Sequence, residues 1–176
     1  MQYSLSTMLP IALAALFSLT QALPSGIALR ASSSQQLADA QNDWRADTSI
    51  VSQFLSAVPT LSGSKLEAAA QVALDAENDE LLHKKVLDQT FSSDKRIVQA
   101  NDVLVTQGTF QSVVDALENF AQNGASMSAS DISTLLQKTN SVRCSQVLPA
   151  IDNYFRVTGE KLNNGGFLLA TRPTNC

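Results

Sequence analysis

Two cysteines constrain the fold of this chain of 176 residues more than any other feature. Cys176 is the last residue, and Cys144 lies within an apolar helical pattern that spans residues 142–155. A cysteine at the end of a chain has no following backbone to hold it, so a bond to Cys144 is the simplest explanation for its position. We therefore expect the C-terminal tail to be fastened to a helix by a Cys144–Cys176 disulfide bond. That bond alone brings no catalytic base, metal site or phosphate-binding loop.

The first 22 residues have the pattern of a secretory signal peptide. A short polar start is followed by an apolar run over residues 9–19, and the segment ends on the small residue Ala22. The apolar run is too short to cross a bilayer as a stable anchor. We therefore expect a secreted, extracellular protein with no transmembrane anchor, in a compartment where a disulfide bond persists.

The mature chain is predicted to be helical after a flexible lead over residues 23–33, which is rich in Ser, Gly and Pro. Apolar residues then keep three- and four-residue spacing up to Pro59, which predicts a first helix. Its apolar positions are Leu37, Ala40, Trp44, Val51, Phe54, Leu55 and Val58. Trp44 is most simply a core residue, and a place on a ligand surface is the alternative.

A second helix is predicted to begin at Ser64, because Ser64 and Glu67 have the spacing of a capping box. Its apolar side is formed by Leu66, Ala69, Ala70, Ala73, Ala76, Leu82, Val86 and Leu87. The many alanines indicate close approach to a neighbouring helix.

Four further signals divide the rest of the chain. Residues 92–94 and 128–131 are helix starts, and Gly108 predicts a break or a close helix contact. Pro149 predicts a kink or short break near residues 144–148, followed by a last helix that ends at residues 163–166. The tail is then expected to fold back antiparallel along that helix, with residues 167–169 covering part of the bundle.

These elements predict an all-α fold, an antiparallel bundle of four to five helices whose C-terminal tail is stapled by one disulfide bond. Residues 34–176 are long enough for one domain and too short for two ordinary ones. No internal repeat of helix-pair length is visible, so a solenoid is the weaker alternative.

One segment has the spacing of a metal site. Glu80 and His83 stand three residues apart on a predicted helix, but a di-iron bundle needs this motif twice and His83 is the only histidine. A zinc site would need several carboxylate ligands, which is unusual. We therefore interpret residues 77–85 as a solvated acidic face with flanking lysines, and expect neither a metal nor another cofactor.

No catalytic arrangement is recognisable. A nucleophile would need a base beside it, both cysteines are assigned to the disulfide bond, and no Gly-x-Ser-x-Gly or phosphate-binding loop occurs. Paired acids leave a carboxylate-dependent hydrolase as a third, weaker alternative. Asp47 and Asp152 lie in apolar patterns and are interpreted as interhelical polar contacts or solvent-facing residues. Lys95-Arg96 is interpreted as a solvated pair in the first turn of a helix rather than a protease site.

Three features of the sequence are considered together. They are the early Trp44, the segment from Arg143 to Asp152, which reads Arg-Cys-x-x-Val-Leu-Pro-Ala-x-Asp, and the Arg-Pro-x-x-Cys end. With these features the chain resembles uncharacterised small secreted helical proteins of filamentous ascomycete fungi. The resemblance implies secretion, helices and the disulfide bond, and no activity. A looser similarity in size and helix content connects the chain to fungal proteins that coat hydrophobic surfaces.

The resulting hypothesis is a secreted, non-catalytic binding protein that acts at a cell or substrate surface. The alternative is a carrier that holds an apolar ligand between its helices. The partner would be a cell-wall or hydrophobic surface, or an apolar small molecule. Nucleic acid is not expected, because the net charge is −4 and no basic cluster with interleaved aromatics occurs. The candidate ligand or surface contacts are Trp44, Phe110, Tyr154 and Phe155.

Overall fold

The computed structural model describes residues 25–164 and 168–176, so the predicted signal peptide lies outside the described residues. Within those ranges every regular element is helical, which confirms the all-α fold class. No helix in the described part of the chain is long and apolar enough to cross a membrane.

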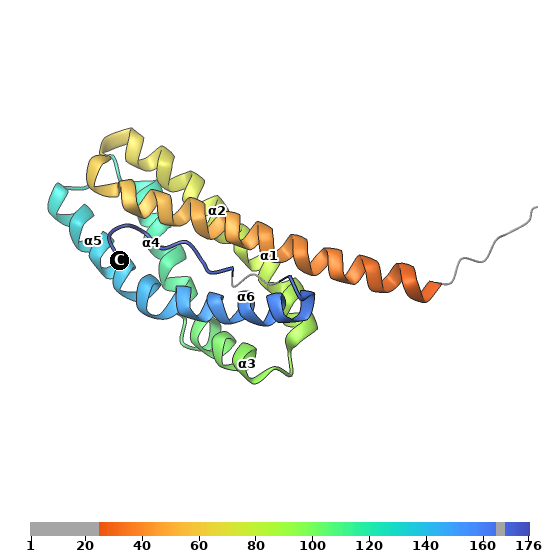
Figure 1. The fold of residues 1–176 in the computed structure, drawn as a ribbon. Coiled ribbons are helices and arrows are strands. Elements are labelled where there is room, and N and C mark those ends of the chain that lie inside the picture. Colours follow the sequence, from red (N-terminus) through yellow and green to blue (C-terminus); the bar gives the residue numbers. More distant parts are fainter. Residues whose placement is uncertain (1–24, 165–167) are drawn as a thin grey trace, which may run out of the picture.

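The bundle is built on two long helices, α1 (Ser25–Ala57) and α2 (Gly63–Phe91). They lie side by side and run antiparallel, and the first turns of α1 extend beyond the other helices (Figure 1). A short 3-10 helix, Val58–Thr60, ends α1 at Pro59 as predicted. The helix begins earlier than predicted, because residues 25–33 are helical rather than a flexible lead. This segment contains Ala28, Leu29 and Ala31, which are strong helix formers.

The middle of the chain follows its local signals closely. Helix α3 (Lys95–Asn101) is capped by Asp94, whose side chain accepts a hydrogen bond from the Arg96 backbone, and it continues into a π-helical segment, Asp102–Thr106. Gly108 then adopts φ = 69°, a left-handed conformation that suits glycine, and α4 (Thr109–Asn123) starts directly after it. The predicted break at Gly108 is confirmed.

The last part of the chain is one long helix with an irregular centre. Helix α5 (Ala129–Val142), capped by Ser128, passes through a π-helical segment, Arg143–Val147, into α6 (Leu148–Leu162). Because Pro149 has no amide hydrogen, it cannot donate the helical bond of its turn, and the wider π-turn occurs directly before it. The described chain therefore forms five continuous helical rods, in agreement with the predicted bundle of four to five helices.

The predicted capping box at the start of α2 is wrong. The helix begins at Gly63, with Ser62 as its first flanking residue, so Ser64 is already inside the first turn. The Glu67 carboxylate instead accepts a hydrogen bond of 2.9 Å from the Ala125 backbone N–H, in the loop between α4 and α5. This residue therefore joins α2 to a distant loop.

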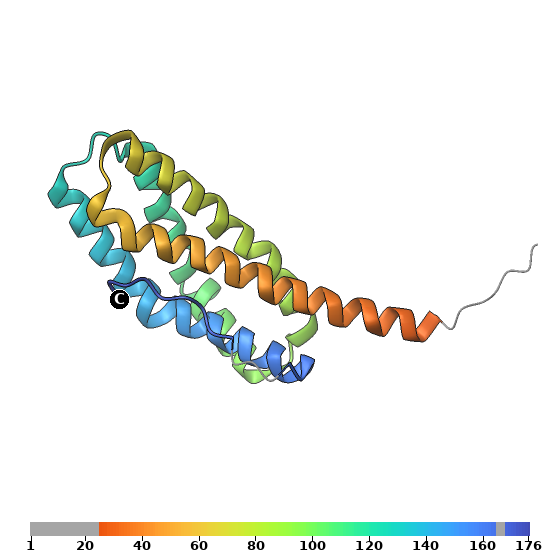
Figure 2. The same ribbon diagram turned by 45° about the horizontal axis from the view of Figure 1, so that its top comes forward.

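The core lies between α1, α2, α4 and α6. Trp44 is fully buried, and its ring lies 5.1 Å from that of Tyr154 and 5.6 Å from that of Phe155, measured between centroids. A second ring contact, between Phe54 and Phe120, joins α1 to α4. Seen from a second direction, the tail runs beside α6 and α1 and ends next to α5 (Figure 2).

Candidate functional site

One stripe of α2 faces the core with a regular spacing of three and four residues, as expected for a helix in a bundle. Three of its eight positions are charged. The stripe consists of Leu66, Ala70, Ala73, Glu77, Glu80, Lys84, Leu87 and Phe91, and all eight residues are buried. The solvated acidic face predicted for residues 77–85 is therefore wrong for Glu77, Glu80 and Lys84.

Glu77 and Glu80 both lie against one arginine from a distant part of the chain. Arg143, in the π-helical segment before α6, donates a hydrogen bond of 2.7 Å from Nη1 to Glu77 Oε2, and its Nη2 lies 3.5 Å from Glu80 Oε1. Trp44 Nε1 donates to Glu80 Oε2 at 2.7 Å. We call Trp44, Glu77, Glu80 and Arg143 the buried charge cluster. All four side chains have no exposed surface, so the cluster is sealed from solvent.

The charges of this cluster do not balance when both carboxyls are ionised. One guanidinium faces two carboxylates, and it lies closer to Glu77 than to Glu80. Burial raises the pKa of Glu80 well above its ordinary value, and the neighbouring Glu77 adds to this increase, whereas Arg143 and the Trp44 hydrogen bond oppose it. Burial also raises the pKa of Glu77, against the opposing effect of Arg143. The geometry therefore favours a proton on Glu80.

The rim of the cluster is an Asp47–His83 contact between α1 and α2. His83 Nε2 lies 3.2 Å from Asp47 Oδ2, and both side chains are partly exposed. Burial raises the pKa of Asp47, and His83 opposes that rise. This confirms an interhelical polar contact for Asp47. Among the described residues no group of three or more His, Cys, Asp or Glu side chains is placed to hold a metal ion.

A second polar network lies one turn further along α2. Lys84 Nζ contacts Asp88 Oδ2 at 2.6 Å and hydrogen-bonds Asn101 of α3, while Tyr154 Oη donates to Asp88 Oδ1 at 2.6 Å. Burial, together with the Asp88 contact, raises the pKa of the Tyr154 hydroxyl. This network therefore joins α2, α3 and α6.

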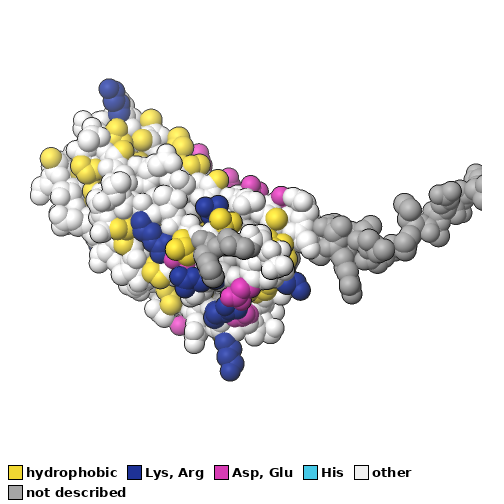
Figure 3. Space-filling model, viewed as in Figure 1, with side chains coloured by type: hydrophobic (Ala, Val, Ile, Leu, Met, Phe, Trp, Pro, Cys, Tyr) yellow, Lys and Arg dark blue, Asp and Glu magenta, His cyan; other side chains and the backbone are white. Residues whose placement is uncertain are grey.

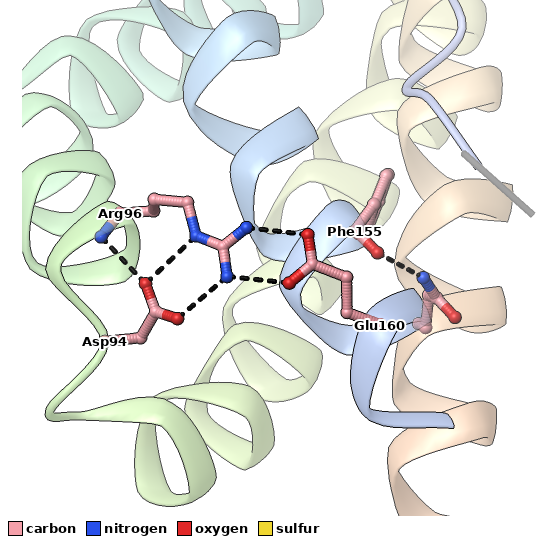
Figure 4. Close-up of polar contacts among 5 residues, drawn as sticks. Asp94, Arg96, Phe155 and Glu160 are labelled. Carbon is pink, nitrogen blue, oxygen red and sulfur yellow. Dashed lines mark hydrogen bonds and ion pairs between the residues drawn. The ribbon is translucent and has the colours of Figure 1, made fainter. Parts of the chain in front are cut away.

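Arg96 joins α3 to α6 at the surface. Its guanidinium binds both carboxylate oxygens of Glu160, at 2.7 and 2.8 Å, and also contacts Asp94 (Figure 4). The same view shows the Phe155 carbonyl accepting a hydrogen bond, which Gln41 of α1 donates. Lys95-Arg96 does begin a helix, as predicted, but Arg96 is an ion-paired residue rather than a freely solvated one.

The predicted disulfide bond between Cys144 and Cys176 is confirmed, with α-carbons 5.7 Å apart. The tail before it is held by side chains of α1, α5 and α6. Asp152 is buried and binds Arg172 at 2.6 Å. The expected return of the tail along α6 is confirmed for residues 168–176. Leu169 is 42% exposed, so the prediction that it covers the bundle is wrong, and Phe167 lies outside the described residues.

An open groove of about 640 Å³ adjoins the disulfide bond. It carries no charged side chain, and six of its residues present hydroxyl or amide groups. It is lined by Pro59, Ser133, Leu136, Gln137, Asn140, Ser141, Cys144, Ser145, Asn175 and Cys176. We call it the disulfide groove. Figure 3 shows that the end of the molecule where α5 and the C-terminus lie carries few charged side chains.

The four predicted contact residues are not at the surface. Trp44, Tyr154 and Phe155 are fully buried and pack on one another, and Phe110 is buried at the start of α4. The structure thus places these aromatic side chains in the core rather than in a surface site. The polar groups that line the disulfide groove are Ser, Asn and Gln side chains, which the spacing of apolar residues does not reveal.

The buried charge cluster can hold a proton and fix helices, but it has no open route for a substrate. The disulfide groove can donate and accept hydrogen bonds, but none of its side chains is an acid or a base. Comparisons of this chain with known protein families, with curated proteins and with solved structures found no match.

Proposed function

We propose that this chain is a secreted, non-catalytic binding protein that acts at a cell or substrate surface. The observation that carries the proposal is the disulfide groove. It is open, none of its side chains is charged, and its lining includes Ser133, Gln137, Asn140, Ser141 and Ser145. Such groups bind a neutral partner through hydrogen bonds without the acid and base needed for chemistry.

The ionisable residues of the interior support the same proposal. Glu77, Glu80 and Arg143 are directed toward one another, and the Trp44 indole covers Glu80. These groups stabilise the bundle and are not presented to a substrate. A neutral hydrogen-bonding polymer of a cell wall fits the groove better than a charged ligand, because no lining side chain supplies a countercharge.

A carrier of apolar ligands is the alternative that the sequence raised. The described interior at Trp44 is filled by the rings of Tyr154 and Phe155, and the disulfide groove has many polar groups. Neither observation favours a carrier, so the surface-binding function is the one that we propose.

The test is depletion of the protein from solution by an insoluble neutral polysaccharide and, in parallel, by hydrophobic beads. Ser141 is an exposed residue of the groove, so Ser141→Glu places an unpaired charge against a neutral partner. We expect this variant to bind the polysaccharide about tenfold more weakly, which corresponds to about 1.4 kcal/mol.

Ser130→Glu is the matched control, since Ser130 is exposed on the same helix and lies outside the groove. It should bind as the unmodified protein does. Equal binding of both variants would contradict the assignment of the groove as the binding site. Binding to the hydrophobic beads alone would contradict a hydrogen-bonding polysaccharide as the partner.

A further inference from the structure

The C-terminal tail is held largely through its main chain. Four of its backbone groups meet side chains of the bundle. Two backbone N–H groups of the tail donate, Ala170 to Asp152 Oδ1 at 2.8 Å and Thr174 to Ser56 Oγ at 2.9 Å. Two carbonyls of the tail accept, Thr171 from Ser52 Oγ at 2.7 Å and Asn175 from Asn140 Nδ2 at 3.4 Å. We call the surface formed by Ser52, Ser56, Asn140 and Asp152 the tail groove. It binds an extended strand by its backbone, which is a common mode of peptide recognition.

Two further features fix which strand fits. Ala170 and Pro173 are buried, so the groove accepts small or compact side chains at these positions. Arg172 donates to both carboxylate oxygens of Asp152, at 3.1 and 2.6 Å, and this is a charge-assisted pair with defined geometry. The strand that satisfies all these contacts is the tail of this chain.

We propose that the tail groove also receives the tail of a second copy of this chain, which gives a tail-exchanged dimer with two intermolecular Cys144–Cys176 bonds. Exchange replaces each contact within one chain by the identical contact between two chains. Both copies then use the same surfaces, so the assembly closes as a symmetric pair.

The sulfur chemistry of this exchange balances without an oxidant. A thiolate attacks one Cys144–Cys176 bond, and the cysteine thiolate that it releases attacks the bond of the second chain. The final displacement expels the original thiolate. Two S–S bonds break and two form, so a small thiol acts only as a catalyst.

In the unmodified protein the tail of the same chain has an advantage. A strand tethered beside its own groove has an effective concentration of about millimolar, so exchange requires a protein concentration near that value. Two charge reversals remove this advantage. In the Asp152→Arg protein the groove carries a positive charge that repels Arg172 of its own tail. In the Arg172→Asp protein the tail carries a negative charge that repels Asp152 of its own groove. In an equal mixture, exchange of the tails places opposite charges together in both grooves.

The experiment mixes ¹⁵N-labelled Asp152→Arg protein with unlabelled Arg172→Asp protein, each full length, in a reduced and oxidised glutathione buffer. Non-reducing gels and peptide mapping by mass spectrometry then identify which chain supplies each cysteine. We expect the mixture to contain about tenfold more disulfide-linked dimer than either variant alone, with labelled Cys144 joined to unlabelled Cys176. A mixture in which every Cys176 stays joined to Cys144 of its own chain overturns the proposal.

The unmodified protein decides the question if either variant fails to fold. Labelled and unlabelled protein are mixed at about millimolar concentration in the same buffer and then diluted. Mixed-label Cys144–Cys176 peptides are expected from a dimer fraction that gel filtration separates from the monomer. Their absence also overturns the proposal.

Discussion

Replacement of Glu80 by Gln tests the proton balance of the buried charge cluster. Glutamine has nearly the same shape, and its amide oxygen can still accept the hydrogen bond from Trp44 Nε1. The change removes one of the two carboxyls that share Arg143. We expect the free energy of unfolding of Glu80→Gln to depend less on pH than that of the unmodified protein.

The direction follows from the raised pKa of Glu80. In the folded protein Glu80 keeps its proton above the pH at which the unfolded chain has released it, so folding takes up a proton. The stability from this group is complete below the unfolded pKa and is lost as pH rises through the folded pKa. Each pH unit within that window lowers the free energy of unfolding by up to about 1.4 kcal/mol for one proton.

A loss of this size per pH unit is a substantial part of the stability margin of a small domain. Glu77 and Asp47 also have raised pKa values and contribute in the same direction. Asp94 and Glu160 have lowered pKa values because they bind Arg96, and they act in the opposite direction at the surface. Glu80→Gln should therefore make the free energy of unfolding less dependent on pH without removing that dependence entirely.

The measurement is urea unfolding at pH 5, 6 and 7, followed by far-ultraviolet circular dichroism and by the fluorescence of Trp44. Glu118→Gln is the control, because it removes an exposed carboxyl of α4 and should keep the slope of the unmodified protein. If Glu80→Gln shows that same slope, Glu80 does not hold the proton and our assignment is wrong.

Two further substitutions test the charge balance and the disulfide bond. Arg143→Met removes the only guanidinium of the cluster and leaves two buried carboxyls without a cationic partner, so we expect a loss of about 3 to 5 kcal/mol at pH 7 in urea unfolding, and a smaller loss at pH 5. Equal losses at both pH values would contradict this account. Cys176→Ser opens a loop whose ends are 32 residues apart and should lower the free energy of unfolding by about 3 to 4 kcal/mol. Its helix content at low temperature should stay the same, and a large loss of helix would show that the tail is needed to form the bundle.

The features that the sequence predicts correctly are those with a local cause. Asp94 and Ser128 cap helices through bonds to residues two and three positions away, and Gly108 supplies a left-handed turn. The disulfide bond is predictable because the chain has two cysteines and therefore one possible pair. Ser64 and Glu67 show the limit of such reasoning, because Glu67 contacts Ala125, 58 residues away, instead of the start of its own helix.

The buried charge cluster has a local signal in its spacing but not in its residue types. Leu66, Ala70 and Ala73 continue with unbroken spacing through Glu77, Glu80 and Lys84 to Leu87, so the sequence does contain a signal for burial. The run of charges suggested a solvated face, whereas Leu82, expected in the core, is 63% exposed. Spacing was the better guide than residue type. Spacing does not identify the partner of a buried charge, because Arg143 lies 66 residues from Glu77 and no local pattern joins them.

The π-helical segment contains Arg143 and Cys144, which are neighbours in sequence and belong to two separate sites. The Leu148 backbone N–H bonds to the Arg143 carbonyl, five residues back, so this turn is wider than that of an α-helix. Arg143 is directed into the core toward Glu77, while Cys144 lines the disulfide groove and binds the tail. Adjacent side chains of a helix point in different directions, so one short segment fixes both the core charge and the tail. A change in the register of this turn would therefore disturb the buried charge cluster and the disulfide groove together.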